Sequence, residues 1–354
     1  MEPFDVAIIG GGPAGSSCAA FCARAGLRTL LLEREKFPRE KVCGDCINPS
    51  CWQVLRALEV ERRVRELPHG KLRTVEFIGI NRQSVTIALP EGAEIAVRRS
   101  LFDDLLMLRA HELGAQILQQ TIVTELSLTS HWLVHAGTGN FESRILVAAD
   151  GRNSTVARLR NLLPRTGRER VALQTHIPLP RDFGERVVLQ FLPEGYSGQA
   201  PTGNAELNVC LVGEPHSIAK LKTWAEKEFG IERDHSWRTI TPLTRRALSP
   251  TEGRLFLIGD VARVVEPFTG EGIFYALRSG ELAAQSIVKI IGGANEERIR
   301  NEYERALHAM YAGRLWLNRL ARSAVLSPRL ASKFVSLARL QPAILRLLTN
   351  RVVR

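Results

Sequence analysis

The sequence predicts an α/β fold: a unit of alternating strands and helices, interrupted by a mostly β insertion and closed by a C-terminal helical segment. Three observations predict it. Residues 5–33 run from an apolar strand through a glycine-rich turn and a helix into a second apolar strand. Residues 170–212 read as successive short strands. Leucines and valines recur at helical spacing between the arginines of residues 314–354.

The turn after the first strand carries glycines in the pattern G-x-G-x-x-G, at Gly10, Gly12 and Gly15. In this pattern the first glycine makes a tight turn, the second lets a pyrophosphate approach the backbone, and the third lets helix and strand pack closely. The pyrophosphate then lies at the start of the helix, here Pro13 and Ala14, where free N–H groups and the helix dipole favour anions. The turn therefore predicts a dinucleotide site.

An acidic residue stands where such a site needs one. Glu33 ends the second strand, 23 residues after Gly10, and Arg34 follows it. A carboxylate at that place accepts hydrogen bonds from the hydroxyls of a ribose. The strand, the glycines, the helix and this acid together predict that the chain binds the ADP half of a dinucleotide.

Two later strand ends favour FAD over NAD. One buried strand ends in Asp150 and Gly151, and another ends in Gly259 and Asp260. Carboxylates at strand ends can bind the ribityl hydroxyls of FAD. A glycine-rich helix start then points N–H groups at the flavin pyrimidine, where negative charge collects on reduction. The residues expected at that helix start are Pro267, Gly270, Gly272 and Ile273.

The remaining pattern divides the chain into segments. Helices are expected over residues 100–113, with Ser100 as the N-cap, and over 216–229 and about 270–292. The predicted division assigns residues 1–70, 96–165 and 251–293 to a Rossmann-type FAD-binding domain, 71–95 and 166–250 to a β-rich substrate domain, and 294–354 to basic C-terminal helices.

These motifs resemble those of the FAD-dependent oxidoreductases of the geranylgeranyl reductase family. That family lies within the para-hydroxybenzoate-hydroxylase-like flavoproteins, which also include aromatic monooxygenases and flavin halogenases. The resemblance covers about residues 1–290. It implies that Arg99 of "RRSLFD" lies near the flavin linker and that the backbone of Val123 contacts adenine. It also implies that the segment with Lys41, Cys43 and Gly44 approaches the flavin.

The segment "KVCGDCINPSCW" (residues 41–52) is open to several interpretations. By the resemblance, Cys43 would help to deliver a proton during hydride transfer, or the cysteine is only tolerated in a turn that shapes the pocket. Cys46 and Cys51 have the C-x4-C spacing of disulfide reductases, although no second nucleotide motif follows. Zinc is disfavoured because no further C-x-x-C or histidine pair occurs, so no metal site is predicted.

The substrate region departs from the resembled family. Where geranylgeranyl reductases show Gly-Tyr-x-Trp-x-Phe-Pro, "GYSGQAP" has Gly198 in place of the tryptophan and Ala200 in place of the phenylalanine. An isoprenoid substrate is thereby put in doubt, and a wider pocket or a bulkier partner is expected. Asp45, Tyr196 and Phe268 are the candidate substrate contacts.

Three functions remain open on the sequence alone. The first is an FAD-dependent reductase or dehydrogenase that moves hydride between the flavin and an apolar or carrier-tethered substrate. The second is an FAD monooxygenase of secondary metabolism that uses NAD(P)H and O2, as a hydroxylase or, less favoured, a halogenase. The third is a flavin electron-transfer protein. Since no second dinucleotide motif is present, the flavin is expected to be reduced by transiently bound NAD(P)H or by a carrier protein.

The basic charge of the chain, concentrated in its C-terminal segment, indicates which kinds of partner it could bind. The chain has 48 basic and 37 acidic residues, and residues 314–354 hold nine basic residues and no acidic one. This tail is expected either to meet an anionic membrane surface or an acidic carrier protein, or to pack on the body as a helical cap. No aromatic platform points to nucleic acid. Without a signal peptide or an apolar run of about 18 residues, a cytoplasmic protein, peripheral at a membrane, is expected.

Overall fold

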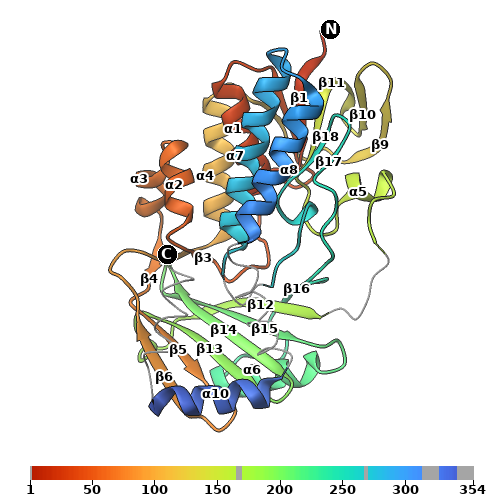
Figure 1. The fold of residues 1–354 in the computed structure, drawn as a ribbon. Coiled ribbons are helices and arrows are strands. Elements are labelled where there is room, and N and C mark those ends of the chain that lie inside the picture. Colours follow the sequence, from red (N-terminus) through yellow and green to blue (C-terminus); the bar gives the residue numbers. More distant parts are fainter. Residues whose placement is uncertain (1, 165–169, 267–269, 313–326, 341–354) are drawn as a thin grey trace.

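The computed structural model describes residues 2–164, 170–266, 270–312 and 327–340. Two large sheets organise these residues, and a layer of helices lies on the first sheet (Figure 1). The helices are α1 (Pro13–Arg24), α2 (Cys51–Ala57), α3 (Glu61–Glu66), α4 (Arg99–Glu112), α5 (Thr155–Leu159), α6 (Ile218–Phe229), α7 (Gly272–Ile291), α8 (Glu296–Ala312) and α10 (Pro328–Leu340).

The first sheet has a parallel centre. Its strands are β17 (Thr251–Glu252), β18 (Leu255–Leu257), β11 (Gly139–Ala148), β1 (Phe4–Ile9), β2 (Thr29–Leu32) and β8 (Gln116–Leu118) in sheet order. In addition, β10 (Trp132–Ala136) pairs with β11, and β9 (Val123–Leu128) pairs with β10. Strands β1, β2 and β18 are short apolar runs, as strands buried on both faces are. Strand β18 pairs in parallel with β11, so a late segment completes the unit begun at the N-terminus.

The helices α1, α4, α7 and α8 lie side by side on this sheet (Figure 1). Helix α1 packs closely on α7, where Ser17 Oγ donates to the carbonyl of Leu277 over 2.9 Å. A Cβ added to Gly280 would lie 2.4 Å from the carbonyl oxygen of Ala14, so only glycine allows this approach. The contact fixes the start of α1 against a helix more than 250 residues away.

The second sheet is mostly antiparallel. Its strands in order are β16 (Arg238–Ile240), β12 (Val171–Pro178), β15 (Glu206–Gly213), β14 (Gly195–Thr202), β13 (Arg186–Leu192), β5 (Thr74–Ile78) and β6 (Ser84–Ala88). Side chains alternate between its faces. Leu211 packs with Leu221 of α6, whereas Val212 packs with Ala331 and Val335 of α10. The helices α6 and α10 therefore cover opposite faces.

A small third sheet joins the two units. It consists of β3 (Cys46–Ile47), β7 (Ile95–Val97) and β4 (His69–Lys71). Cys46 pairs with Ala96 in antiparallel register, and the N–H of Val97 donates to the carbonyl of Asp45 over 2.9 Å. The cysteine-rich segment, residues 41–52, is thus anchored at the boundary between the first sheet with its helices and the second sheet.

Two expectations from the sequence need correction, and one open alternative is decided for α10. Helix α4 starts at Arg99 with Arg98 as its N-cap, and no side chain caps it, so Ser100 is not the N-cap. Helix α7 starts at Gly272, two residues later than expected, because Gly270 has a left-handed φ of 66°. Helix α10 packs on the second sheet through Ala331 and Val335, which is the packing alternative for that part of the tail.

None of the helices in the described part of the chain has both the length and the apolar character that crossing a bilayer requires. Most of the segment from residue 313 onward lies outside the described residues. Of the basic C-terminal segment predicted from the sequence, the structure describes residues 327–340, which include α10. Pro267 and Phe268 also lie outside the described residues.

Candidate functional site

A cavity of about 920 Å³ runs from the glycine-rich turn to helix α10. We call its two parts the glycine end and the apolar end. The glycine end is lined by Gly10, Gly12, Glu33, Arg34, Val123, Asp150 and Asp260, among others. The apolar end is lined by Val75, Phe77, Val187, Leu189, Phe191, Tyr196, Ala200, Val212, Leu243, Ala331 and Val335. The volume of the whole cavity is at the upper end of the range for cofactor and ligand sites, roughly 300–1,000 Å³.

The glycines shape the glycine end by steric exclusion. A Cβ on Gly10, whose φ is 105°, would lie 2.6 Å from the carbonyl oxygen of Ala149, and one on Gly15 would lie 1.8 Å from that of Gly10. At Gly12 the nearest atom would be Arg39 Nη2, 3.6 Å away. Because no side chain caps α1 at Gly12, its first N–H groups are available to an anion over an open cradle.

The acid at the end of β2 is held in place by backbone amides. Glu33 is buried, its Oε2 accepts a hydrogen bond of 2.6 Å from Gly11 N–H, and its Oε1 accepts one of 2.8 Å from Glu35 N–H. The carboxylate of Glu33 therefore faces the glycine-rich turn, and its predicted hydrogen bonds to a ribose stay a prediction. Arg34 beside it is exposed and pairs with Glu35 over 3.3 Å, and Val123 lines the same end.

A cluster of cations lies next to the open cradle. Arg99 makes two hydrogen bonds of 2.7 and 2.8 Å to the buried carboxylate of Asp103, and Arg39 donates to the same carboxylate over 2.9 Å. Two guanidinium groups on one carboxylate leave a net positive charge. Burial, with Arg39 and Arg99 nearby, lowers the pKa of Lys41 to about 8. Arg39 was missed by sequence reasoning, since it belongs to no motif and reaches Asp103 across 64 positions.

The two strand-end carboxylates already have partners within the chain. Asp150 accepts hydrogen bonds from Ser154 Oγ and Thr155 N–H, both over 2.6 Å, and so caps α5. Asp260 pairs with Arg152 over 2.8 Å. Both line the cavity, with Gly151, Gly259, Gly270, Gly272 and Ile273. Contact of these residues with FAD stays a prediction.

The cysteine-rich loop lies between the two ends. Cys43, Gly44 and Cys46 line the cavity, and Lys41 lies with them. None of the six cysteines is in a disulfide, so Cys46 and Cys51 are not joined here, and Cys51 is buried with its thiol 3.4 Å from Asn48 Oδ1. Burial raises the pKa of the Cys43 thiol, which therefore keeps its proton at neutral pH. Within the described residues no group of three His, Cys, Asp or Glu side chains could hold a metal.

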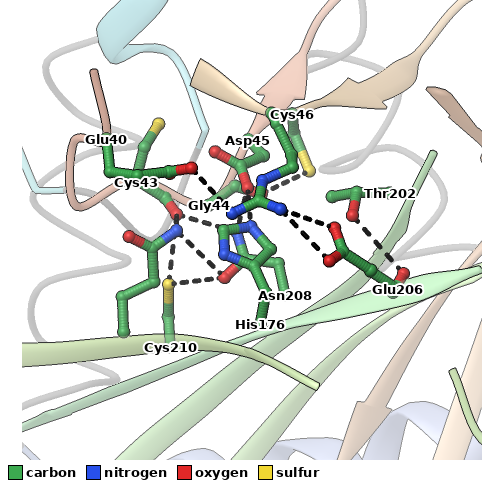
Figure 2. Close-up of polar contacts among 12 residues, drawn as sticks. Glu40, Cys43, Gly44, Asp45, Cys46, His176, Thr202, Glu206, Asn208 and Cys210 are labelled. Atoms are coloured by element: carbon green, nitrogen blue, oxygen red, sulfur yellow. Dashed lines mark hydrogen bonds and ion pairs between the residues drawn. The ribbon is translucent and has the colours of Figure 1, made fainter. Parts of the chain in front are cut away.

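Four side chains of the second sheet hold this loop, and we call them the loop clamp: Gln174, His176, Asn208 and Cys210. The carbonyl of Cys43 accepts hydrogen bonds of 2.8 Å from both Gln174 Nε2 and Asn208 Nδ2, and Cys210 Sγ lies 3.3 Å from it. Figure 2 shows His176 of β12 and Asn208 and Cys210 of β15 converging on the loop.

Asp45, the predicted substrate contact, is held by two side chains of this clamp. It does not line the cavity, is fully buried, and has a left-handed φ of 61°. Its carboxylate accepts hydrogen bonds from His176 Nε2 over 2.7 Å and from Asn208 Nδ2 over 2.8 Å (Figure 2). Burial raises the pKa of Asp45. The partners lie 131 and 163 positions away, which explains why sequence reasoning assigned this aspartate to the pocket.

Comparison with known proteins now decides the cofactor. Residues 3–184 match the family described as FAD binding domain, which is half of the chain. The chain is 30% identical over 319 residues to the menaquinone reductase of Mycolicibacterium smegmatis, covering 79% of this chain and 75% of that protein. The chain belongs to the FAD-binding family and is an FAD-dependent oxidoreductase.

Further relatives of this FAD-dependent oxidoreductase are more distant. The geranylgeranyl diphosphate reductase of Synechocystis is 28% identical, with 80% of this chain and 75% of that protein covered. Conditioned medium factor receptor 1 of Dictyostelium discoideum is 25% identical, and the match spans only 63% of its length. A flavin-dependent brominase has the same fold, with a TM-score of 0.81, 22% identity, and 98% and 94% of the two chains covered.

The glycine end fits FAD. The cradle at Gly12 could accept a pyrophosphate, because a side chain there would fill the space and the cations Arg39 and Arg99 lie beside it. At the start of α7, a Cβ on Gly270 or Gly272 would meet no atom within 4 Å, so the backbone there can approach a flat ring. The flavin would then lie near Cys43 and Gly44, at the entrance to the apolar end.

The apolar end carries the substrate candidates that the structure describes. Tyr196 is buried, lines the cavity, and has its pKa raised by burial. Gly198 and Ala200, which replace the larger residues of the resembled motif, line the same wall on β14. The wall is therefore open where a tryptophan and a phenylalanine would otherwise project.

Proposed function

We propose that this oxidoreductase is a reductase that moves hydride from FAD to an apolar or carrier-tethered substrate, with NAD(P)H as the transient reductant of the flavin. The observation that carries the proposal is the apolar end of the cavity, which begins at the cysteine loop and is walled by aliphatic and aromatic side chains from both the second sheet and α10. Such a wall binds a substrate by burying apolar surface. Two relatives are named reductases of menaquinone and of geranylgeranyl diphosphate, which supports an apolar substrate.

The residues of this chain have separable roles in that reaction. Bound FAD supplies the hydride chemistry. Glu33, Arg39 and Arg99 orient the nucleotide at the glycine end, and the loop clamp fixes Cys43 and Gly44 between cofactor and substrate. The apolar end excludes water from the substrate carbon. The small side chains on β14 leave room for a ring or a branched chain beside the loop.

Substrate-dependent reoxidation tests the proposal. Holoprotein is reduced without oxygen and mixed in a stopped-flow instrument either with a menaquinone or geranylgeranyl lipid or with oxygenated buffer. We expect the lipid to reoxidise the flavin anaerobically and to gain two hydrogen atoms. Oxygen consumption coupled to a product that carries one inserted oxygen atom would identify a monooxygenase instead. Rapid exchange only with a redox protein would identify an electron-transfer protein.

We also propose that the mouth of the apolar end meets an anionic membrane surface. Leu330 in the first turn of α10 is 64% exposed and lines the cavity, and Arg329 and Lys333 beside it are exposed. An exposed leucine flanked by cations suits the boundary between headgroups and acyl chains. An apolar substrate could then enter the cavity directly from the lipid.

A further inference from the structure

One carboxyl group of the cavity differs from the others. Six carboxylates among the described residues line the cavity, and five of them are bound to a partner within the chain: Glu33 to Gly11 N–H, Glu35 to Arg34, Glu40 to Arg98, Asp150 to Ser154, and Asp260 to Arg152. Glu94, the sixth, makes no hydrogen bond or ion pair with the described residues. Sequence reasoning did not single it out, since it belongs to no motif.

The backbone around Glu94 places it at the apolar end. The preceding residue, Ala93, is fixed by a hydrogen bond of 2.7 Å from Trp52 Nε1 to its carbonyl. The following residues form β7, which pairs with Cys46 of the cysteine loop. Ala93 and Cys46 both pack against the apolar cluster that contains Val75 and Ala200. The carboxyl group therefore opens into the part of the cavity that would hold the substrate, beside the loop that would face the flavin.

Two arginines in the neighbouring segments are bound to other groups. Arg65 of α3 donates to the carbonyl of Gly92 and pairs with Glu61 over 3.0 Å. Arg98 pairs with Glu40 over 2.7 Å and with Glu206 over 2.9 Å. The neighbouring titratable group is the Cys46 thiol. Burial, and then the nearby Glu94, raise its pKa well above the ordinary value of a cysteine, so this thiol stays neutral. Burial without a counter-charge raises the pKa of Glu94 to about 7.

We propose that Glu94 is the catalytic acid that supplies the proton during reduction of the substrate. This inference rests on the proposed reductase function. Reduction of a double bond adds one hydride and one proton. The hydride, with both electrons, comes from reduced flavin, itself reduced by NAD(P)H. The O–H bond of Glu94 breaks as the second bond to hydrogen forms on the substrate, and the resulting carboxylate regains a proton from water.

The acidity of the two candidate donors favours Glu94 over Cys43. A general acid works best when its pKa lies near the working pH. The carboxyl group of Glu94 meets that condition, whereas burial raises the pKa of the Cys43 thiol above the ordinary value of a cysteine. A thiol of that kind gives up its proton slowly at neutral pH. Cys43 is then part of the loop that shapes the pocket, and Glu94 is the acid.

The test compares Glu94→Gln with Glu91→Gln, an exposed glutamate in the same segment. The rate constant for anaerobic, lipid-dependent reoxidation is measured from pH 5 to pH 9. For wild type and Glu91→Gln we expect a rate that falls above about pH 7, because the acid must be protonated. Glu94→Gln should lower the rate roughly 10²- to 10⁴-fold and remove this fall, with FAD affinity unchanged. The Cys43→Ala variant should still show the fall in rate above about pH 7.

A second readout does not depend on activity. A carboxyl group whose pKa is raised by folding stabilises the folded state below its unfolded pKa, and this stability is lost as pH rises through the folded pKa. The Tm of the wild-type apoprotein should therefore fall relative to that of Glu94→Gln between pH 4.5 and about 7. A constant difference would overturn the proposal.

The outcomes separate the two proposals. If lipid reoxidises the wild-type flavin and Glu94→Gln is equally fast, the role of Glu94 is overturned while the reductase function stands. If no lipid reoxidises the wild-type flavin, the reductase function fails, and the catalytic role of Glu94 fails with it.

Discussion

The two ends of the cavity are built by different means. At the glycine end, backbone shape is set by glycines within five positions of one another, and its carboxylates all have partners in the chain. At the apolar end, the wall comes from strands and a helix spread over more than 250 positions, and one carboxyl group has no partner among the residues that the structure describes. At the first end, the polar groups are held by contacts within the chain. At the second end, an apolar wall surrounds a carboxyl group that is open to a substrate.

Replacing Gly15 with alanine should break the glycine end with the largest effect. The added Cβ would lie 1.8 Å from the carbonyl oxygen of Gly10, so the turn or α1 must move away from the pyrophosphate. We expect FAD affinity to fall at least about 100-fold, which is about 3 kcal/mol. Titration of the apoprotein with FAD, followed by flavin fluorescence, measures it. Gly137→Ala is the control, since its Cβ would meet no atom within 4 Å. Equal affinities for the two variants would contradict the steric account.

The glycine end could be predicted from sequence because its determinants are local. The spacing of Gly10, Gly12 and Gly15 implies a turn, and the structure shows that turn with Glu33 bonded to it. The parallel strand order follows from apolar runs that alternate with helices. The predicted membership of the FAD-dependent oxidoreductases is confirmed by the comparisons.

The apolar end could not be predicted in the same way, because its contacts are made across the chain. Asp45 sits in a motif-like segment, yet its partners His176 and Asn208 come from strands that only the fold brings near. Glu94 lies in a turn with no pattern, and only the positions of Trp52 and Cys46 around it bring it to the cavity. Ser100 was a reasonable N-cap by residue type, but the helix starts one residue earlier.

Replacing Asn208 with leucine should loosen the boundary between the ends. The substitution removes the 2.8 Å hydrogen bonds to the carbonyl of Cys43, which is half-buried, and to the carboxylate of Asp45, which is buried. Leaving these acceptors without their donors should lower the free energy of unfolding by about 2–4 kcal/mol, as measured by urea denaturation. Because the loop is freed, alkylation of Cys43 in the folded protein, followed by mass spectrometry, should become faster.

The matched control for the clamp is Asn301→Leu, an exposed position on α8. It should leave both the unfolding free energy and the alkylation rate near those of wild type. If Asn208→Leu destabilises the protein but leaves Cys43 alkylation unchanged, the clamp stabilises the sheet without fixing the loop. The boundary between the two ends would then be set by β3 and β7 alone.

The smallest effect is expected at the mouth of the apolar end, where Lys333 is exposed on α10. A lysine near an anionic bilayer contributes about 1 kcal/mol, so Lys333→Ala should weaken binding to phosphatidylserine vesicles roughly fivefold, and less at high salt. Vesicle co-sedimentation measures it. Lys227→Ala is the control, because Lys227 is exposed on α6, which covers the opposite face of the same sheet. Equal binding by both variants would show that net charge, and not the mouth of the cavity, attracts the membrane. Substrate would then have to reach the apolar end through water or on a carrier protein.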